Sequence, residues 1–160
     1  MKKIVPIELN TENFKEYGYV ISKMELKPDA DNEEFKYWSK ISQFNIKGTT
    51  STGILCPSKR EMIVKSFERH VNTIEVLVAL QGDSIICVGK QSATDDREIE
   101  CIQAFHIKQG EAFLMNKGIW HWIPYPLNSM GSKFLVMFSS GTEDNDLEIK
   151  HLTNEIKIII

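Results

Sequence analysis

Short stretches in which hydrophobic and polar residues alternate dominate the second half of the chain, and such alternation is typical of half-buried β-strands. Residues 62–70 are the clearest case, with Glu68 and His70 on one face and Phe67 and Arg69 on the other. Because successive side chains of a strand point to opposite faces, Arg69 is expected to point away from His70.

Further stretches predict a series of short strands. A hairpin is predicted from strands at 76–80 and 84–88, joined by the turn Gln81-Gly82-Asp83. Other strands are predicted at 37–46 (one strand or a pair), 102–107, 112–115 and 134–138. Many short strands with regular turns indicate a sandwich or small barrel, so the chain is expected to be mainly β.

The remaining segments have simpler patterns. Residues 11–17 predict a short N-terminal helix capped by its first residue and ended by a left-handed Gly18. Residues 28–34 are expected to form a surface loop, and residues 94–98 a charged connection with at most one helical turn. The apolar stretch 156–160 is expected to pair with a sheet edge or a second subunit.

Composition narrows the class of protein. The 160 residues fit a single domain, 1–160, and are 42% hydrophobic and 26% charged. A net charge of −3 argues against a nucleic-acid partner. No apolar stretch is long enough to span a bilayer, so no membrane partner is expected. The three cysteines show no CxxC spacing and are expected to be small buried residues, as in a cytoplasmic protein.

Two groups of residues have the spacing of a known pair of motifs. In the first, His70 is followed after five residues by Glu75 and after seven more by Gly82, with Glu68 two residues before His70. The first cupin motif runs His-x-His, then Glu, then six residues and Gly, so Glu68 replaces its first His.

The second group lies later in the chain. Gly110 is followed after six residues by Asn116, then by Gly118, and three residues later by His121. The second cupin motif runs Gly, five residues, Pro-x-Gly, two residues and His, so Asn116 replaces its Pro. The chain therefore resembles the cupins, and the three glycines are expected to be turn residues.

Three blocks are similar to the ureidoglycolate lyase family, also called ureidoglycolate hydrolases. They are Phe14-x-x-Tyr17-Gly18-x-Val20-Ile21, Glu68-Arg69-His70 continuing through Glu75 to Gly82, and Ala104-Phe105 with Gly118-Ile119-Trp120-His121. The resemblance implies a cupin-type double-stranded β-helix (a jelly-roll barrel) that forms a homodimer. It also implies a carbon–nitrogen lyase that cleaves ureidoglycolate to glyoxylate and urea in allantoin and purine catabolism.

The chain departs from that family close to the expected pocket. Trp122 and Ile123 precede Pro124, where the family commonly has a second His before the Pro. Val71 stands where a Pro is often found. Two alternatives therefore stay open: another cupin enzyme acting on a small hydroxy- or keto-acid, and a non-catalytic cupin that binds a small molecule.

Lysis of ureidoglycolate needs a base for the hydroxyl proton and a positive group for the carboxylate. We expect His70, Glu75 and His121 to form the catalytic centre, and these residues with Glu68 to be the ligands if a divalent ion such as Ni²⁺, Zn²⁺ or Mn²⁺ binds. Without an ion, His121 is the expected base, oriented by Glu75. No organic cofactor is expected.

Other side chains are candidates for binding a small-molecule acid. Arg69 or Lys117 is expected to hold the substrate carboxylate, although strand alternation turns Arg69 away. Trp120 and Trp122 are expected to wall the pocket. Trp38 is expected in the core, and His106 and His151 are expected to be structural.

Overall fold

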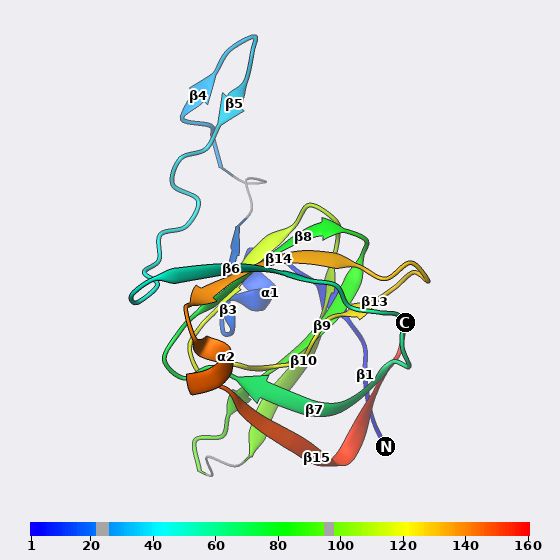
Figure 1. Ribbon diagram of the computed structural model, residues 1–160. Coiled ribbons are helices and arrows are strands. Elements are labelled where there is room, and N and C mark those ends of the chain that lie inside the picture. The colour runs from blue at the N-terminus through cyan, green and yellow to red at the C-terminus, as the bar shows by residue number, and fades with distance from the viewer. Residues whose placement is uncertain (22–25, 95–97) are drawn as a thin grey trace.

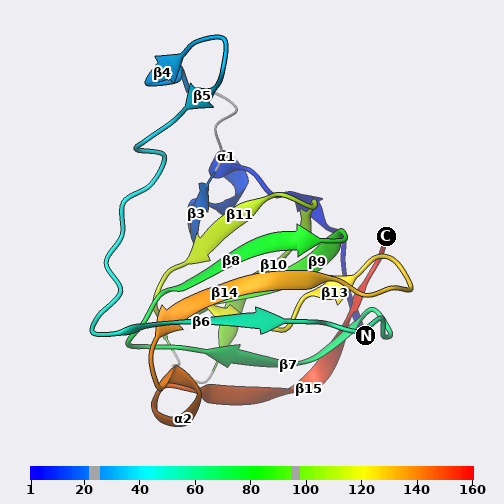
Figure 2. The same cartoon turned by 45° about the horizontal axis from the view of Figure 1, so that its top comes forward.

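The computed structural model describes residues 1–21, 26–94 and 98–160, and its main body is a barrel of two facing β-sheets (Figures 1 and 2). In the larger sheet the strands follow the order β1 (Lys2–Ile4), β15 (Glu148–Ile158), β7 (Ile63–Arg69), β12 (Trp120–His121), β9 (Ser84–Gln91), β10 (Ile99–Ile107) and β2 (Ile7–Glu8), with β13 (Tyr125–Pro126) also paired to β9. The mainly β class predicted from the sequence is confirmed.

The second sheet has the order β3 (Gly18–Ile21), β11 (Ala112–Met115), β8 (Glu75–Gln81), β14 (Lys133–Ser139) and β6 (Thr50–Leu55). Two short helices, α1 (Thr11–Phe14) and α2 (Thr142–Asn145), accompany the sheets. A separate two-stranded sheet, β4 (Ala30–Asp31) with β5 (Lys36–Tyr37), projects from the barrel as an arm (Figure 1).

The main core lies between the two sheets. Strand β9 shows how the sequence builds it, because Ile86 and Val88 belong to the core cluster shared with the second sheet. Ile85 and Cys87, at the alternate positions, join a second cluster on the other face of the larger sheet. Both faces of β9 are therefore buried over residues 85–88, and this is why that stretch is continuously apolar.

The hairpin predicted over residues 76–88 is wrong. Strand β8 pairs with β11 and β14 in one sheet, whereas β9 pairs with β10, β12 and β13 in the other. The connection through Gly82, which has a φ of +75°, crosses from sheet to sheet instead of folding one strand onto the next. Because both strands are apolar on both faces, the sequence locates the turn without identifying the strands' partners.

The N-terminal helix is present but shorter than predicted. Helix α1 is capped by Asn10, whose Oδ1 accepts from the Asn13 N–H at 2.8 Å, and it ends at Phe14. Gly18 is not its left-handed stop but the first residue of β3. A Cβ on Gly18 would lie 1.8 Å from the carbonyl oxygen of Leu114, so this position needs glycine for close strand pairing.

The strand predicted at 37–46 is also wrong, since only its first residue is in a strand, β5. Phe44 is 40% exposed and Trp38 is half-buried, with its Nε1 donating to the Leu26 carbonyl at 2.7 Å, so Trp38 is not a core residue. The alternation of apolar and polar residues over 37–46 belongs to the end of the arm and to the extended segment that leads from the arm to β6. The loop predicted at 28–34 contains β4, and residues 95–97 of the predicted charged connection lie outside the described residues.

The two ends of the chain meet in one sheet. Strand β15 contains most of the apolar C-terminal stretch and pairs antiparallel with β7 and parallel with β1, where Lys2 lies opposite Ile156. The expectation that this stretch pairs with a strand is therefore confirmed within the chain. Neither described helix is long and apolar enough to cross a membrane.

The close approach at Gly18 gives a stability test. Replacing Gly18 with Ala should lower the free energy of unfolding by about 2 kcal/mol, because the new methyl group collides with backbone. Gly53→Ala is the control, since a Cβ there meets nothing within 4 Å. Denaturant titration would measure both, and equal midpoints for the two variants would contradict the packing described for β3.

Candidate active site

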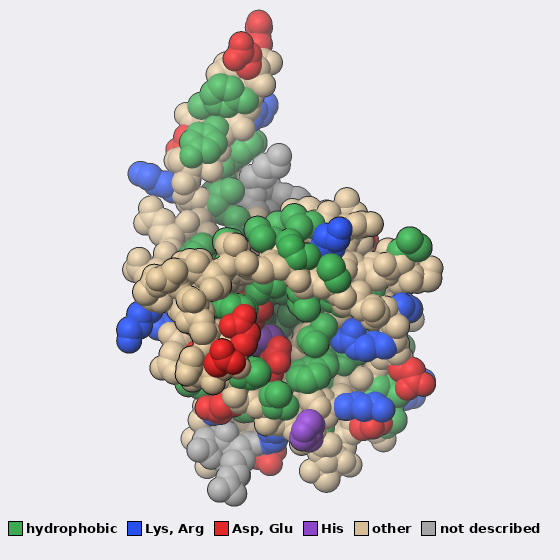
Figure 3. Space-filling view, viewed as in Figure 1, with side chains coloured by type: hydrophobic (Ala, Val, Ile, Leu, Met, Phe, Trp, Pro, Cys, Tyr) green, Lys and Arg blue, Asp and Glu red, His purple; other side chains and the backbone are tan. Residues whose placement is uncertain are grey.

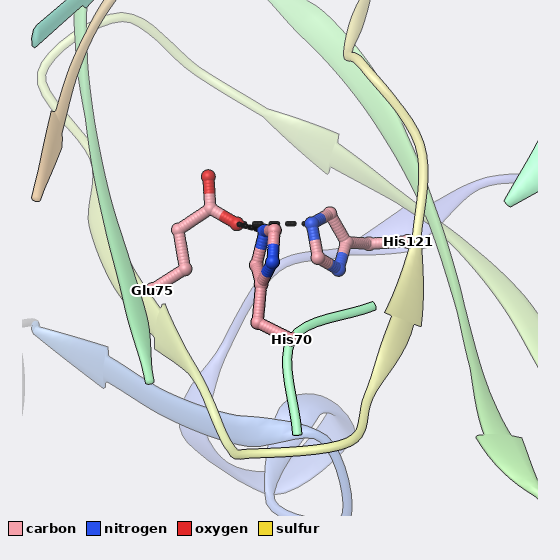
Figure 4. Close-up of side chains that lie close together, drawn as sticks. All are labelled: His70, Glu75 and His121. Carbon is pink, nitrogen blue, oxygen red and sulfur yellow. Dashed lines mark ion pairs between the residues drawn. The ribbon is translucent and has the colours of Figure 1, made fainter. Parts of the chain in front are cut away.

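Three buried side chains converge at one point: Glu75 on β8, His121 on β12, and His70 directly after β7 (Figure 4). The His121 Nε2 lies 2.9 Å and the His70 Nε2 3.5 Å from the Glu75 Oε2. Their candidate ligand atoms all lie within 4.8 Å of one another. The sequence motifs named these residues, and the structure brings them together.

Strand pairing explains this convergence. Strand β12 lies between β7 and β9, with His121 opposite Glu68 on β7. His70 follows β7 directly, on the same face as Glu68, and its carbonyl accepts from the Gly118 N–H at 2.7 Å. Backbone hydrogen bonds thus join the two motifs, whose histidines, His70 and His121, are about fifty residues apart in the sequence.

The other nitrogen of each imidazole is held by backbone. The His70 Nδ1 lies 2.7 Å from the Asp146 carbonyl oxygen, and the His121 Nδ1 lies 2.9 Å from that of Ile119. Because a carbonyl can only accept, each Nδ1 carries a hydrogen. In the neutral imidazoles each Nε2 therefore has a lone pair, which faces Glu75.

This arrangement suits a divalent ion. The Glu75 Oε2 and His121 Nε2 are buried, and despite their 2.9 Å separation neither has a hydrogen-bond partner of good geometry among the described residues. Two imidazole nitrogens and a carboxylate oxygen, with each imidazole fixed from behind by a backbone carbonyl, are typical of a transition-metal site. The donor set thus fits the predicted ion.

Electrostatics couples the same groups when no ion is present. Burial opposes charge on each, but the two imidazoles hold the pKa of Glu75 well below its usual range. Glu75 in turn raises the pKa of His121 and His70 above the ordinary histidine value despite their burial. Burial raises the pKa of Glu68, whose Oε1 lies 3.8 Å from the His121 Nε2.

These residues line a cavity of about 310 Å³. The space-filling view shows a hollow with hydrophobic and acidic side chains around it and a histidine inside (Figure 3). Its walls are largely apolar: Leu55, Leu77, Ile86, Trp122, Ile123, Pro124, Val136, Phe138 and Leu147. A cavity of this size suits a small molecule.

The structure does not bring three predicted substrate-binding residues to this cavity. Arg69 points to the opposite face of β7, where its Nε donates to Glu148 at 2.8 Å and its guanidinium lies 4.5 Å from the centroid of the Trp120 ring. Trp120 is buried in the second core cluster, because it alternates with the inward-facing His121. Lys117 is exposed and does not line the cavity. Trp122 does line it.

No Lys or Arg is among the described residues that line the cavity, whereas three carboxylates are: Glu68, Glu75 and Glu143. The nearby Arg60 donates instead to the carbonyls of Ile123 and Pro124, at 2.5 and 2.9 Å. Arg60 therefore holds one wall of the cavity in place and does not present its charge inside.

Sequence reasoning missed the contribution of the α2 region. Glu143 on α2 and Leu147 just after it line the cavity, and Asp146 between them contacts His70 through its backbone. No motif marks this segment, which reads as a polar surface turn. His106 and His151 lie outside the cluster, beside Asp83 at 3.6 Å and Ser66 at 2.8 Å.

Comparison with known proteins adds two findings. A family model described as ureidoglycolate lyase matches residues 1–159. No curated protein matches the chain.

A solved structure supports the fold, and a second is less similar. A 3,4-ketoisomerase from Helicobacter canadensis is similar with a TM-score of 0.50 and 18% identity, over 77% of this chain and 86% of that chain. Oxalate decarboxylase from Bacillus subtilis at pH 4.6 has a TM-score of 0.45 and 15% identity, over 65% of this chain and 24% of that chain, so this chain spans about a quarter of its length. The cupin-type barrel predicted from the sequence is confirmed.

The converging donors give a binding test. Titration with Mn²⁺ or Ni²⁺ followed by calorimetry should reveal one ion per chain, and Glu75→Gln should weaken its binding by more than about 100-fold, because a charged ligand is lost from a buried site. His106→Ala is the matched control and should bind as the unchanged protein does. Equal affinities for the Glu75 variant and the control would contradict the assignment.

Proposed function

This chain belongs to the ureidoglycolate lyase family, and we propose that it cleaves ureidoglycolate into glyoxylate and urea. The observation that carries the proposal is the buried His70–Glu75–His121 cluster at the wall of a cavity sized for a small molecule. The family supplies the reaction, and the cluster supplies groups suited to it.

We propose that His70, Glu75 and His121 hold one divalent ion, for which Ni²⁺, Zn²⁺ and Mn²⁺ are the candidates. When bound there, the ion supplies positive charge for the substrate's carboxylate and lowers the pKa of its hydroxyl. The cavity lining supports this, since the residues described there include no Lys or Arg to balance a substrate anion.

With both Nε2 atoms engaged as ligands, neither histidine is free to act as base. Glu68, expected from the sequence as a fourth ligand, is outside the compact group of three ligand residues and takes that role instead. Its carboxylate lies beside His121, and burial raises its pKa toward the range that general bases use. Glu68 accepts the hydroxyl proton while that oxygen forms the glyoxylate C=O and the C–N bond breaks. The proton then passes to the departing nitrogen, which leaves as urea. The role first given to His121 applies only to an ion-free site.

The apolar walls of the cavity support this chemistry. Leu77, Ile86 and Val136 come from both sheets and present hydrocarbon to the cavity. Such walls limit the water around the reacting groups, which strengthens the electrostatic interactions among them.

We propose in addition that the chain forms a homodimer through the arm. Phe35, Tyr37 and Phe44 are 52%, 55% and 40% exposed there, and a hairpin this small is not stable by itself. A cytoplasmic location is proposed because all three cysteines are unpaired, although only Cys87 is buried as expected, whereas Cys56 and Cys101 are exposed.

Sedimentation equilibrium tests the dimer. Changing Phe35 and Tyr37 together to Ser should shift the protein to monomer. Without their apolar area, burial at the interface no longer offsets the entropy lost on association. Met130→Ser, at an 88% exposed position away from the arm, is the control. An unchanged dimer in the double variant, or a monomeric unchanged protein, would contradict the proposal.

Two variants separate ion binding from proton transfer. Glu68→Gln should bind the ion but lower kcat for glyoxylate release by about 10²–10⁴-fold, since only the base is lost. His121→Ala should lose both ion and turnover, while its stability stays within about 1–2 kcal/mol of the unchanged protein.

Coupled assays for glyoxylate and urea, with calorimetry for the ion, measure these effects. A fully active Glu68→Gln enzyme would rule out Glu68 as the base. Binding of glyoxylate by the unchanged protein without any turnover of ureidoglycolate would instead indicate a non-catalytic small-molecule-binding cupin.

A further inference from the structure

We infer that Asp146, which belongs to neither sequence motif, is a positioning residue that fixes the orientation of His70. It lies between α2 and β15, distant in sequence from the proposed ligands. The inference rests on the proposed function, in which His70 is an ion ligand.

The Asp146 carboxylate organises the turn between two members of the cluster. It accepts hydrogen bonds from three successive backbone N–H groups, those of residues 71, 72 and 73, at 2.9, 2.9 and 3.2 Å, and from the Asn72 side chain at 3.0 Å. These residues connect His70 to the strand that begins at Glu75. A carboxylate surrounded by consecutive amides holds such a turn in one conformation.

The backbone of the same residue holds the imidazole itself. The Asp146 carbonyl oxygen lies 2.7 Å from the His70 Nδ1 and keeps the hydrogen on that nitrogen. The Nε2 is then the unprotonated atom of the neutral ring, and it faces Glu75. One residue therefore sets both the position of the turn and the tautomer of the histidine.

Asp146 also joins this histidine to the cavity rim. Its backbone N–H donates to the Thr142 carbonyl at 2.9 Å, which fixes it against α2. Glu143 on that helix and Leu147, the next residue along the chain, both line the cavity. Asp146 consequently connects the part of the cavity rim formed by the α2 region to the proposed ligand His70.

The carboxylate is not available for catalysis. Its hydrogen bonds to four donors use the lone-pair sites that a carboxylate offers. Asp146 is also absent from the residues that line the cavity. Its effect on the reaction must therefore pass through His70.

The test compares Asp146→Ala and Asp146→Asn with Asp144→Ala as the matched control. Asp144 is an exposed acid on α2, and its side chain makes no hydrogen bond or ion pair with the described residues. Calorimetric titration with Mn²⁺ measures ion affinity, ¹⁵N–¹H correlation of the ion-free protein reports the His70 tautomer, and thermal unfolding monitors the fold.

Asp146→Ala should bind Mn²⁺ about 10-fold to 100-fold more weakly, because the carboxylate that fixes the turn after His70 against the Asp146 carbonyl is lost. At a pH above the pKa of His70, where the ring is neutral, the His70 of this variant should populate both tautomers, whereas the unchanged protein shows only the Nδ1–H form. Asp146→Asn keeps one acceptor oxygen and the same shape, so it should give an intermediate loss with little change in unfolding temperature. The Asp144 control should match the unchanged protein.

The inference is overturned if Asp146→Ala is folded and keeps both the Mn²⁺ affinity and the single tautomer. Should Asp146→Ala fail to fold, Asp146→Asn decides by the same two measurements. If the unchanged protein has no lyase activity, the proposed function alone is overturned, because the tautomer and the ion affinity are measured without substrate.

Discussion

Burial of the Glu75 carboxylate between two imidazoles is the constraint around which this barrel is arranged. A carboxylate removed from water is costly unless positive charge or hydrogen-bond donors compensate it. Here that compensation comes from His121 at 2.9 Å and His70 at 3.5 Å, either as protonated rings or as fellow ligands of an ion. Glu75 therefore keeps its negative charge in the interior only while both histidines are in place.

The surrounding structure keeps them in place through backbone contacts. The two-residue strand β12 is held between β7 and β9, which sets His121 opposite Glu68. Carbonyls of Ile119 and Asp146 fix the imidazoles from behind. Precise placement of these side chains thus depends on backbone hydrogen bonds to residues such as Ile119 and Asp146, which do not themselves line the cavity.

Sequence predicted the parts of this site that follow from local periodicity and motif spacing. Alternation correctly turned Arg69 away from His70, and the same rule, applied to Trp120 beside His121, would have placed Trp120 outside the cavity. The partners of β8 and β9 could not be predicted, because a strand that is buried on both faces is apolar throughout, and its sequence pattern does not indicate which sheet it joins. Asp146 was missed because its role depends on a contact between segments more than seventy residues apart.

The pairing of β1 with β15 gives the chain an order of assembly during synthesis. Strand β1 is synthesised long before the strand it pairs with, since Lys2 lies opposite Ile156. The larger sheet therefore cannot close before β15 has been made, and Asp146 cannot reach the turn after His70 before its own segment is synthesised. A chain that stops before β15 would expose the edge of β7 that β15 covers and would lack the carbonyl contact behind His70.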